Sequence, residues 1–447
     1  MNYWNIQLHP NDLRWNKERE LLEKHGMIGL GDWDEAARQQ PDFENAMAIG
    51  DVVLVKHGGS IIALVEVIGN YEYQEHTDDL LWFQRRRKVK VLDWYKETYG
   101  YSVSPRKTLE RSVGTDTSTY QSIIHWIQRI NNKKQMESYI NLLNTNYNLI
   151  LTGAPGTGKT YLSKQIAAQM ILGKEYDEKT APKEEKDKMD EQCGFVQFHP
   201  SYDYIDFIEG LRPIDDGAGN VSFRREDGIF MKFCRKALEA YNKADDKEAV
   251  PKYVFIIDEI NRGELSKIFG ELFFSIDPGY RGEAGKVKTQ YCNLWKEADS
   301  YAGSDAFFIP KNVYIIGTMN DIDRSVESMD FAMRRRFAFK EIIASDTMDM
   351  IKSNEKLKES YPFIEERMKN LNLCILTIQG FSSAYQIGAA YFLKLANYLE
   401  NGKITETSWK SLWDNHLYGL LYEYLRGLPN AKDDLKKLRS AYGLTDE

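Results

Sequence analysis

The chain has 447 residues, with 59 Lys and Arg against 67 Asp and Glu, for a formal net charge of −8. Its 42% hydrophobic content excludes a mainly disordered chain. At roughly 100–200 residues per domain, the length predicts two to four domains. No window approaches about 18 uninterrupted apolar residues and no signal peptide is visible, so we expect a cytoplasmic protein.

Four cysteines are scattered along the chain, with no pair at metal-ligand spacing and no nearby histidine spacing. This pattern predicts neither a disulfide framework nor a zinc module. The cysteines are Cys193, Cys234, Cys292 and Cys374.

The N-terminal segment, residues 1–105, is expected to form a small β-rich α+β domain. Two apolar runs at 51–56 and 60–68 flank His57-Gly58-Gly59, which predicts a hairpin. A third run at 87–92 alternates like a half-buried strand, and helices are expected near 13–24 and 34–40. A polar stretch that contains Pro and Gly predicts a linker at 106–120.

A larger α/β domain is predicted at residues 121–345, followed by an α-helical domain at 346–447. Helical spacing at 121–143 precedes an alternation of apolar strands and helices, which favours a parallel sheet covered on both faces. The strands are expected at 149–151, 194–198, 253–257 and 313–318. Between them, residues 173–192 are predicted as a charged loop and 212–228 as a protruding hairpin.

The sequence G-x-x-x-x-G-K-[ST] occurs from Gly153 to Thr160, directly after a predicted strand and before a predicted helix. In that context glycines let backbone N–H groups surround phosphates, Lys159 reaches the β- and γ-phosphates, and Thr160 is a ligand of Mg²⁺. We therefore predict a nucleotide site. Its nucleotide-contacting residues are Gly153, Ala154, Pro155, Gly156, Thr157, Gly158, Lys159, Thr160 and Tyr161.

Two acids end the apolar strand that begins at Tyr253. We expect Asp258 to hold the magnesium and Glu259 to polarise an attacking water. At the tip of a third strand, Asn320 is a candidate for orienting that water and Asp323 for supporting it, with an Asn- and Asp-rich turn as the alternative.

Three consecutive arginines, Arg334, Arg335 and Arg336, end a short predicted helix. They either complement the helix dipole or supply an arginine finger to the nucleotide of a neighbouring subunit. We favour the finger, although the sequence does not distinguish which arginine acts.

These motifs resemble an AAA+ ATPase module, and the segments 198–213, 258–263 and 319–324 resemble the McrB family. That family comprises the GTP-hydrolysing motor subunits of modification-dependent restriction systems. The resemblance implies a role for Asn261, GTP as substrate, a hexameric ring, and a separate McrC-type nuclease partner. The phosphate loop itself contacts only phosphates, so ATP stays open.

More faintly, residues 2–95 resemble the EVE and YTH group of PUA-like domains, which flip a modified base into an aromatic pocket. Trp33 is the candidate wall with Asp32 as edge reader, and Trp4 and Trp82 are further candidates; the alternative is that these tryptophans are core residues. The basic stretch at 85–88 is expected either to hold phosphates or to guard a strand edge.

We therefore expect a reader of methylated DNA joined to a nucleotide-driven ring that works in phage defence with a nuclease. Two rival functions remain at this point. One is a MoxR-like AAA+ chaperone, and the other is an RNA-directed defence ATPase.

Overall fold

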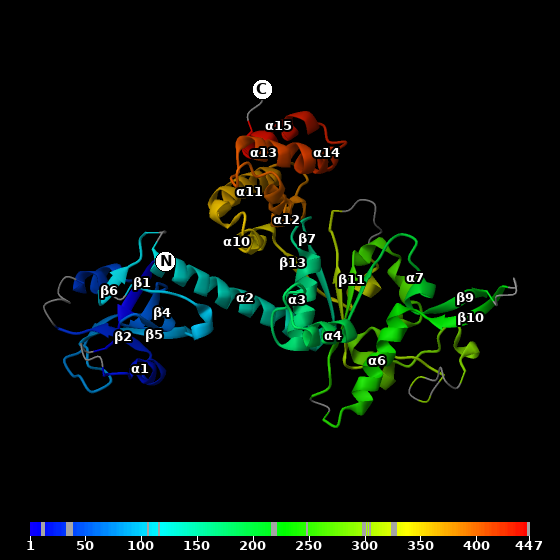
Figure 1. Cartoon of the computed structure of the whole chain (residues 1–447), viewed down its shortest axis with the longest axis horizontal. Helices are drawn as coiled ribbons and strands as arrows, with labels where there is room; N and C mark the ends of the chain where they lie inside the picture. Colours follow the sequence, from blue (N-terminus) through cyan, green and yellow to red (C-terminus); the bar gives the residue numbers. More distant parts are fainter. Residues whose placement is uncertain are drawn as a thin grey trace. The chain divides into compact units, whose positions relative to one another are not determined.

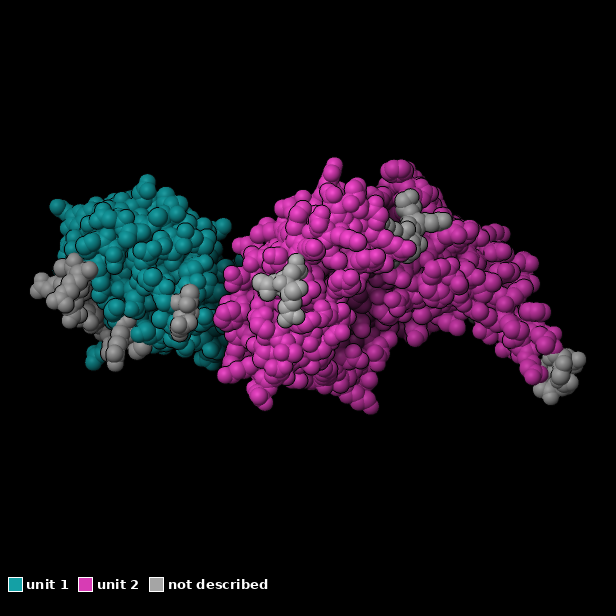
Figure 2. Space-filling view, turned by 90° about the horizontal axis from the view of Figure 1, so that it is seen from above, with its two compact units in different colours: residues 1–138 teal, residues 139–447 magenta. Residues whose placement is uncertain are grey.

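A computed structural model describes residues 1–9, 14–32, 39–104, 107–114, 117–215, 221–246, 249–296, 301, 303, 305–322 and 329–444. The chain divides into two compact units, Met1–Ser138 and Tyr139–Glu447, which Figure 2 colours separately. All four cysteines are free. Within the described ranges, no helix is long and apolar enough to span a bilayer.

The first unit is built on one six-stranded mixed sheet with the strand order β2-β5-β4-β3-β1-β6 (Figure 1). Its elements are β1 (Tyr3–Gln7), α1 (Glu18–Lys24), β2 (Met27–Leu30), β3 (Val52–His57), β4 (Ser60–Tyr73), β5 (Arg85–Trp94) and β6 (Leu109–Arg111). The predicted hairpin is confirmed, because β3 pairs antiparallel with β4 through His57 and Ser60. The helix expected at 34–40 lies largely outside the described residues.

Residues expected to form a linker at 106–120 contain β6, which pairs antiparallel with β1. This short strand escaped prediction because its three residues are too few to show an alternating pattern. Helix α2 (Ser118–Asn146) follows. Its residues Ile123 and Trp126 are buried against Leu54 and Leu64 of the first unit.

The second unit contains a five-stranded parallel sheet in the order β13-β7-β12-β11-β8, as predicted for an α/β domain. The strands are β7 (Asn148–Gly153), β8 (Cys193–Gln197), β11 (Tyr253–Asp258), β12 (Val313–Thr318) and β13 (Ala338–Ile342). The strand β7 lies between β12 and the edge strand β13, and its carboxyl end lies at the end of the sheet where ligands bind in such folds.

Helices cover both faces of this sheet. Phe230 and Phe233 of α6 (Ile229–Lys243) pack with Phe255 and other inward residues of one face. Helix α3 (Lys159–Leu172) contacts the strands β7, β11 and β12. This part of the second unit also contains the helices α4 (Lys183–Gln192), α5 (Tyr204–Phe207), α7 (Leu265–Phe269), α8 (Leu272–Ser275) and α9 (Phe331–Arg334).

Two predictions for this layer have different outcomes. The hairpin expected at 212–228 is confirmed as β9 (Glu209–Asp215) paired with β10 (Val221–Asp227) (Figure 1). The prediction of a charged loop at 173–192 is wrong for the second half of that segment, because α4 occupies Lys183–Gln192. Acids in its first turn complement the helix dipole, and the buried Met189 anchors it.

The C-terminal part is helical, as predicted, and has its own core around Leu371, Phe392, Trp413 and Tyr442. Its helices are α10 (Asp349–Lys352), α11 (Tyr361–Leu376), α12 (Ala389–Phe392), α13 (Glu406–Leu412), α14 (Tyr418–Leu425) and α15 (Ala431–Ala441). We call this part the lid.

Candidate nucleotide-binding site

The predicted phosphate loop runs from the buried strand β7 into α3. Its glycines Gly153, Gly156 and Gly158 have φ values of 139°, 77° and 72°. Residues that carry a side chain rarely adopt backbone conformations with such positive φ values, so the loop requires glycine at these positions. Gly158 caps α3, whose N-terminus carries the positive end of the helix dipole. The local chain therefore has the form of an anion-binding turn.

Lys159 is buried within this loop, with 7% of its surface exposed. Its Nζ donates to the carbonyl oxygens of Gly153 and Ala154, both at 2.9 Å. Burial lowers the pKa of Lys159 to about 8, and the negative charges of Glu259 and Asp258 oppose that shift. A phosphate arriving at the loop would give this ammonium a negative partner in direct contact.

Asp258, at the end of β11, connects the phosphate loop to the neighbouring strand. The hydroxyl of Thr160 and the hydroxyl of Thr318 each donate to Asp258 Oδ1 at 2.6 Å. Thr318 Oγ1 also accepts from the backbone N–H of Glu259 at 3.1 Å. Sequence reasoning missed Thr318; the available signal was a hydroxyl residue ending the strand before Asn320.

Glu259 and Asn320 come together as a pair. Asn320 Nδ2 donates to Glu259 Oε1 at 2.7 Å, and Arg262 Nε lies 3.4 Å from Glu259 Oε2. Burial raises the pKa of Glu259, an effect that Arg262 opposes. Glu259 has a positive φ of 51°, which is uncommon for a residue with a side chain and typical of functional turns. The Asn320 amide thus fixes the Glu259 carboxylate, whose raised pKa makes it a better proton acceptor.

Asn261 also joins this group, because its Nδ2 lies 3.4 Å from the carbonyl oxygen of Asn320 and donates to it. Asp323, predicted as a supporting acid, lies outside the described residues. The structure therefore brings together Asp258, Glu259, Asn261 and Asn320 beside the phosphate loop.

The donor set at Thr160 and Asp258 fits a magnesium ion. A hydroxyl and a carboxylate oxygen already meet there, and both are oxygen ligands of the kind that Mg²⁺ prefers. Across the described ranges, no group of three or more His, Cys, Asp or Glu residues is arranged to hold a metal. A magnesium ion at Thr160 and Asp258 would therefore depend on phosphate oxygens and water for its other ligands.

The three predicted arginines differ in burial. Arg336 has 7% of its surface exposed, its Nη1 donates to Ala332 O, and its guanidinium lies 4.2 Å from the centre of the Phe273 ring. Arg334 and Arg335 are exposed. Arg336 is thus held within its own subunit, which leaves Arg334 and Arg335 accessible.

A strap of the lid, residues 386–390, lies directly on the phosphate loop. The backbone N–H of Gly388 donates to Pro155 O and that of Ala390 donates to Gly156 O, each at 3.0 Å. A Cβ at Gly388 would lie 2.3 Å from the carbonyl carbon and oxygen of Gly156. From the other side, Asn372 exchanges hydrogen bonds with Ile387 at 2.7 and 3.0 Å. Sequence reasoning found no such contact.

In the first unit, the three tryptophans predicted for a base pocket have different outcomes. Trp4 is fully buried, and its indole donates to Asp51 Oδ2 at 2.9 Å, so it is a core residue and not a pocket wall. Trp82 is half-buried and donates to Leu8 O at 3.0 Å. Trp33 lies outside the described residues.

The acidic candidate of this unit is already paired, and part of its basic stretch is buried. Asp32 forms an ion pair with Arg85 and accepts from the Tyr73 hydroxyl at 3.0 Å. Arg86 and Arg87 are buried, with 7% and 5% of their surfaces exposed. For these two residues, burial therefore contradicts both expectations for the basic stretch, a phosphate-holding patch and a charged strand edge exposed to solvent.

Comparison with known proteins agrees with the nucleotide site. Residues 148–337 match the AAA domain of the dynein-related subfamily, and residues 12–121 match a domain of unknown function (DUF8426). The resemblance of the first unit to EVE and YTH domains consequently stays a prediction. A putative ATPase structure from Cytophaga hutchinsonii aligns with a TM-score of 0.26 at 12% identity, over 67% of this chain and 89% of that chain.

Two curated relatives are components of restriction enzymes. The Type IV methyl-directed restriction enzyme EcoKMcrB subunit of Escherichia coli (strain K12) is 37% identical over 281 residues, which are 61% of this chain and 52% of that protein. The Type II restriction enzyme BsuMI component YdiS of Bacillus subtilis (strain 168) is 27% identical over 43% of this chain and 56% of that protein. The chain spans about half the length of these relatives.

The parallel sheet, the phosphate loop and the acids at the end of β11 define an AAA+ nucleotide-binding protein. Within that class, the chain is similar to the McrB subunit over the 281 aligned residues, and the phosphate loop and the acids of β11 lie within the matched AAA domain.

Proposed function

We propose that this chain is the nucleotide-hydrolysing motor of a modification-dependent DNA restriction system, and that it drives a separate McrC-type endonuclease. The observation that carries the proposal is two hydrogen-bonded pairs beside the phosphate loop: Thr160 with Asp258 at 2.6 Å, and Asn320 with Glu259 at 2.7 Å. This arrangement has the parts that phosphoryl transfer to water requires. The name of the E. coli relative, a methyl-directed restriction enzyme subunit, supports the biological role.

In this proposal each residue has one task. Lys159 leaves its two loop carbonyls to bind the β- and γ-phosphates, while Thr160 and Asp258 hold magnesium, which neutralises phosphate charge. Glu259 accepts a proton from the attacking water. Asn320, bonded to Glu259 at 2.7 Å, orients that water without adding charge.

Asn261 and Asp323 support Asn320 and its loop in the proposed mechanism. The motor acts as a hexameric ring, in which an exposed arginine reaches the nucleotide of the neighbouring subunit. Arg334 and Arg335 are the candidates, since Arg336 is buried against Phe273. An arginine finger of this type stabilises charge that develops on the transferring phosphate.

GTP is the proposed substrate, on the strength of the resemblance to the McrB family. The first unit is proposed to recognise methylated DNA, which gives the motor its dependence on modification. Neither role follows from the phosphate loop, whose contacts are with phosphates alone.

The experiment is cleavage of a methylated and an unmethylated plasmid by the full chain combined with a McrC-type endonuclease, Mg²⁺ and GTP. We expect cleavage of the methylated plasmid only, and none with the Lys159→Ala variant. If the chain hydrolyses nucleotide while both plasmids stay intact, the restriction function is refuted although the nucleotide site stands.

A further inference from the structure

Arg281 of the second unit is a buried cation with an unusual set of partners. Only 3% of its surface is exposed, and its guanidinium lies 5.4 Å from the centre of the Tyr147 ring. Its Nη2 donates to Asn148 Oδ1, whereas its Nε and Nη1 have no hydrogen-bond acceptor among the described residues. Burial lowers the pKa of Arg281 to about 10. Such a group is costly to bury, so its bond to Asn148 needs an explanation.

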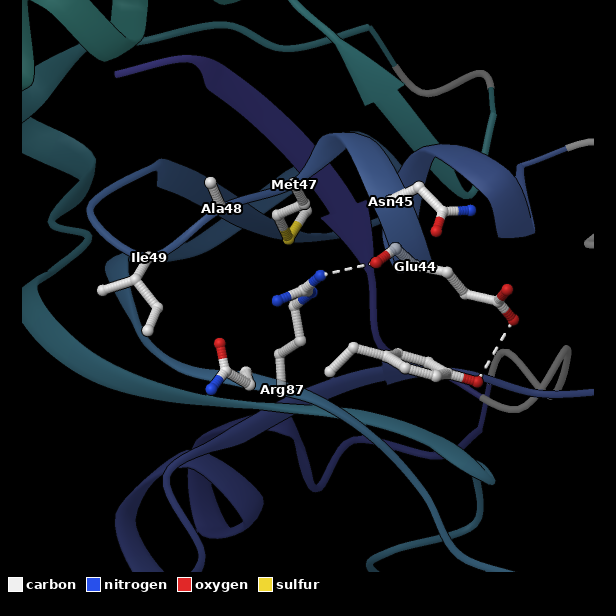
Figure 3. Close-up of a pocket in the computed structure, with 8 residues that line it drawn as sticks. Glu44, Asn45, Met47, Ala48, Ile49 and Arg87 are labelled. Carbon is white, nitrogen blue, oxygen red and sulfur yellow. Dashed lines mark hydrogen bonds between the residues drawn. The ribbon is translucent and has the colours of Figure 1, made fainter.

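Arg87 of the first unit shows a more usual way to bury a guanidinium. Its Nε donates to Phe43 O at 2.8 Å and its Nη2 to Glu44 O at 2.9 Å, and Figure 3 shows the bond to Glu44. Backbone carbonyls therefore account for the orientation of Arg87. The hydrogen bond of Arg281 goes instead to a side chain, so its effect depends on what that side chain holds.

Asn148, the first residue of β7, is fully buried and ties two other segments together. Its Nδ2 donates to Ile276 O at 2.7 Å and to Arg336 O at 2.8 Å. An amide nitrogen has two N–H groups, so both are used. Arg281 can only donate and the two carbonyls can only accept, which leaves one orientation for the amide. Arg281 therefore directs both donors of Asn148 toward these carbonyls.

The side chain of Arg336 joins the same two segments. Its guanidinium lies 4.2 Å from the centre of the Phe273 ring, and Phe273 belongs to α8, whose C-cap carbonyl Asn148 also holds. Arg336 is consequently held at its main chain by Asn148 and at its side chain by Phe273. The exposed residues Arg334 and Arg335 immediately precede this fixed point.

Asn148 and the phosphate loop lie at opposite ends of one strand. A strand rises about 3.3 Å per residue, so Asn148 lies roughly 16 Å from Gly153, where the loop begins. The parallel strand β13 pairs with β7 from Leu149 onward, and the bond from Asn148 to Arg336 continues this ladder toward the arginines. The bonds of Asn148 thus act on the arginines and not on the nucleotide of the same subunit.

We propose that Asn148, oriented by Arg281, is a positioning residue for the arginine finger. By fixing the main chain of Arg336, it sets the direction in which Arg334 and Arg335 leave their subunit toward the nucleotide of its neighbour. A displacement of about 1 Å at the reacting groups can lower a rate about 100-fold, so this main-chain bond bears directly on hydrolysis. The inference rests on the proposed ring and on its arginine finger in trans.

Asn148→Asp is the direct variant, because a carboxylate still accepts from Arg281 but cannot donate to the two carbonyls. We expect hydrolysis at least about tenfold slower, with unchanged affinity for a fluorescent GTP analogue. Asn312→Asp is the matched control. Asn312 directly precedes β12, is 5% exposed, and donates through Nδ2 to Ala237 O at 2.9 Å and Pro251 O at 3.0 Å. It has the same amide chemistry at the foot of the neighbouring strand.

Mixing with Glu259→Gln subunits distinguishes a misplaced finger from a damaged site. These subunits supply arginines but do not hydrolyse nucleotide. An excess of them should therefore raise the rate per Asn148→Asp subunit at least about fivefold and leave the rate per Asn312→Asp subunit unchanged. An Asn148→Asp rate that the mixture does not raise, or an equal rise for Asn312→Asp, overturns the proposal.

Arg281→Met is the second variant, in case Asn148→Asp does not fold. Replacing a buried ion by an apolar side chain of similar length is often neutral or stabilising, so this variant should keep its melting temperature. It removes only the donor that orients Asn148. We expect slower hydrolysis and the same rescue by Glu259→Gln subunits. A folded Arg281→Met protein that hydrolyses nucleotide at the wild-type rate overturns the proposal.

A variant without exposed arginines separates this inference from the proposed function. The double variant Arg334→Ala, Arg335→Ala cannot supply a finger, and Glu259→Gln subunits should rescue it. If they do not, the finger in trans is refuted and the inference fails with it. If they rescue the double variant but neither Asn148→Asp nor Arg281→Met, the finger stands and the positioning role is refuted.

Discussion

Gly388→Ala should detach the lid strap from the phosphate loop. Gly388 has an ordinary φ of −79°, so alanine introduces no backbone strain, only a methyl group. That methyl would lie 2.3 Å from the carbonyl of Gly156 and 2.4 Å from the amide nitrogen of Thr157. These are backbone atoms that cannot rotate away, so the strap must move.

A separation of roughly 1 Å restores ordinary van der Waals contact. The two hydrogen bonds from Gly388 and Ala390 start at 3.0 Å, so the same movement takes both beyond bonding distance. At about 1 kcal/mol for each bond, the docked state loses about 2 kcal/mol, which corresponds to about a 30-fold change in the docking equilibrium.

Hydrogen exchange of peptides covering residues 386–392 measures this change. We expect exchange in that peptide to become roughly 30-fold faster in Gly388→Ala. Gly419→Ala is the matched control, because Gly419 is exposed in α14 and a Cβ there meets no atom within 4 Å. Unchanged protection in Gly388→Ala, with the strap still docked, would refute the reasoning.

Three further outcomes are expected. Glu259→Gln should bind nucleotide with near-normal affinity but hydrolyse it at least about 100-fold more slowly, as single-turnover kinetics would report; normal turnover would remove Glu259 from the mechanism. Arg335→Ala should lower the rate of hydrolysis without lowering the melting temperature. Arg336→Ala should lower the melting temperature, because it removes the guanidinium from the face of Phe273. If thermal and kinetic assays of the two variants show the reverse, Arg336 is the finger and Arg335 the structural residue. Bound phosphates favour protonated Lys159, whose pKa is about 8 in the free protein. Nucleotide affinity should therefore fall as the pH rises above about 8, by about tenfold at pH 9. A calorimetric affinity that stays constant to about pH 9.5 would contradict this.

The nucleotide site was largely predictable because its chemistry is encoded in contiguous segments. The run from Gly153 to Thr160 specifies a loop between a strand and a helix, and the apolar strand ending at Asp258 specifies its neighbour. Parallel strands end at the same edge of a sheet, which is why Asp258, 98 residues from Thr160 in sequence, meets its hydroxyl.

Contacts between distant segments were not predictable in the same way. No local pattern reveals that Gly388 meets Gly156, since that contact depends on how the lid packs. The basic run at 85–88 was misjudged for a similar reason: Arg87 is buried because carbonyls of residues 43, 44 and 69 surround it. Trp4 was misassigned because an aromatic residue serves equally well in a core or a pocket, and only the fold shows that Trp4 is fully buried and bonded to Asp51.

The most direct test of the account compares hydrolysis of GTP and ATP by the full chain with Mg²⁺, each in the presence of a modified or an unmodified duplex of the same sequence. The account predicts faster hydrolysis of GTP and a further increase with the modified duplex alone. Faster hydrolysis of ATP, at a rate that neither duplex changes, would contradict the proposal that this McrB-like chain is the motor of a modification-dependent restriction system.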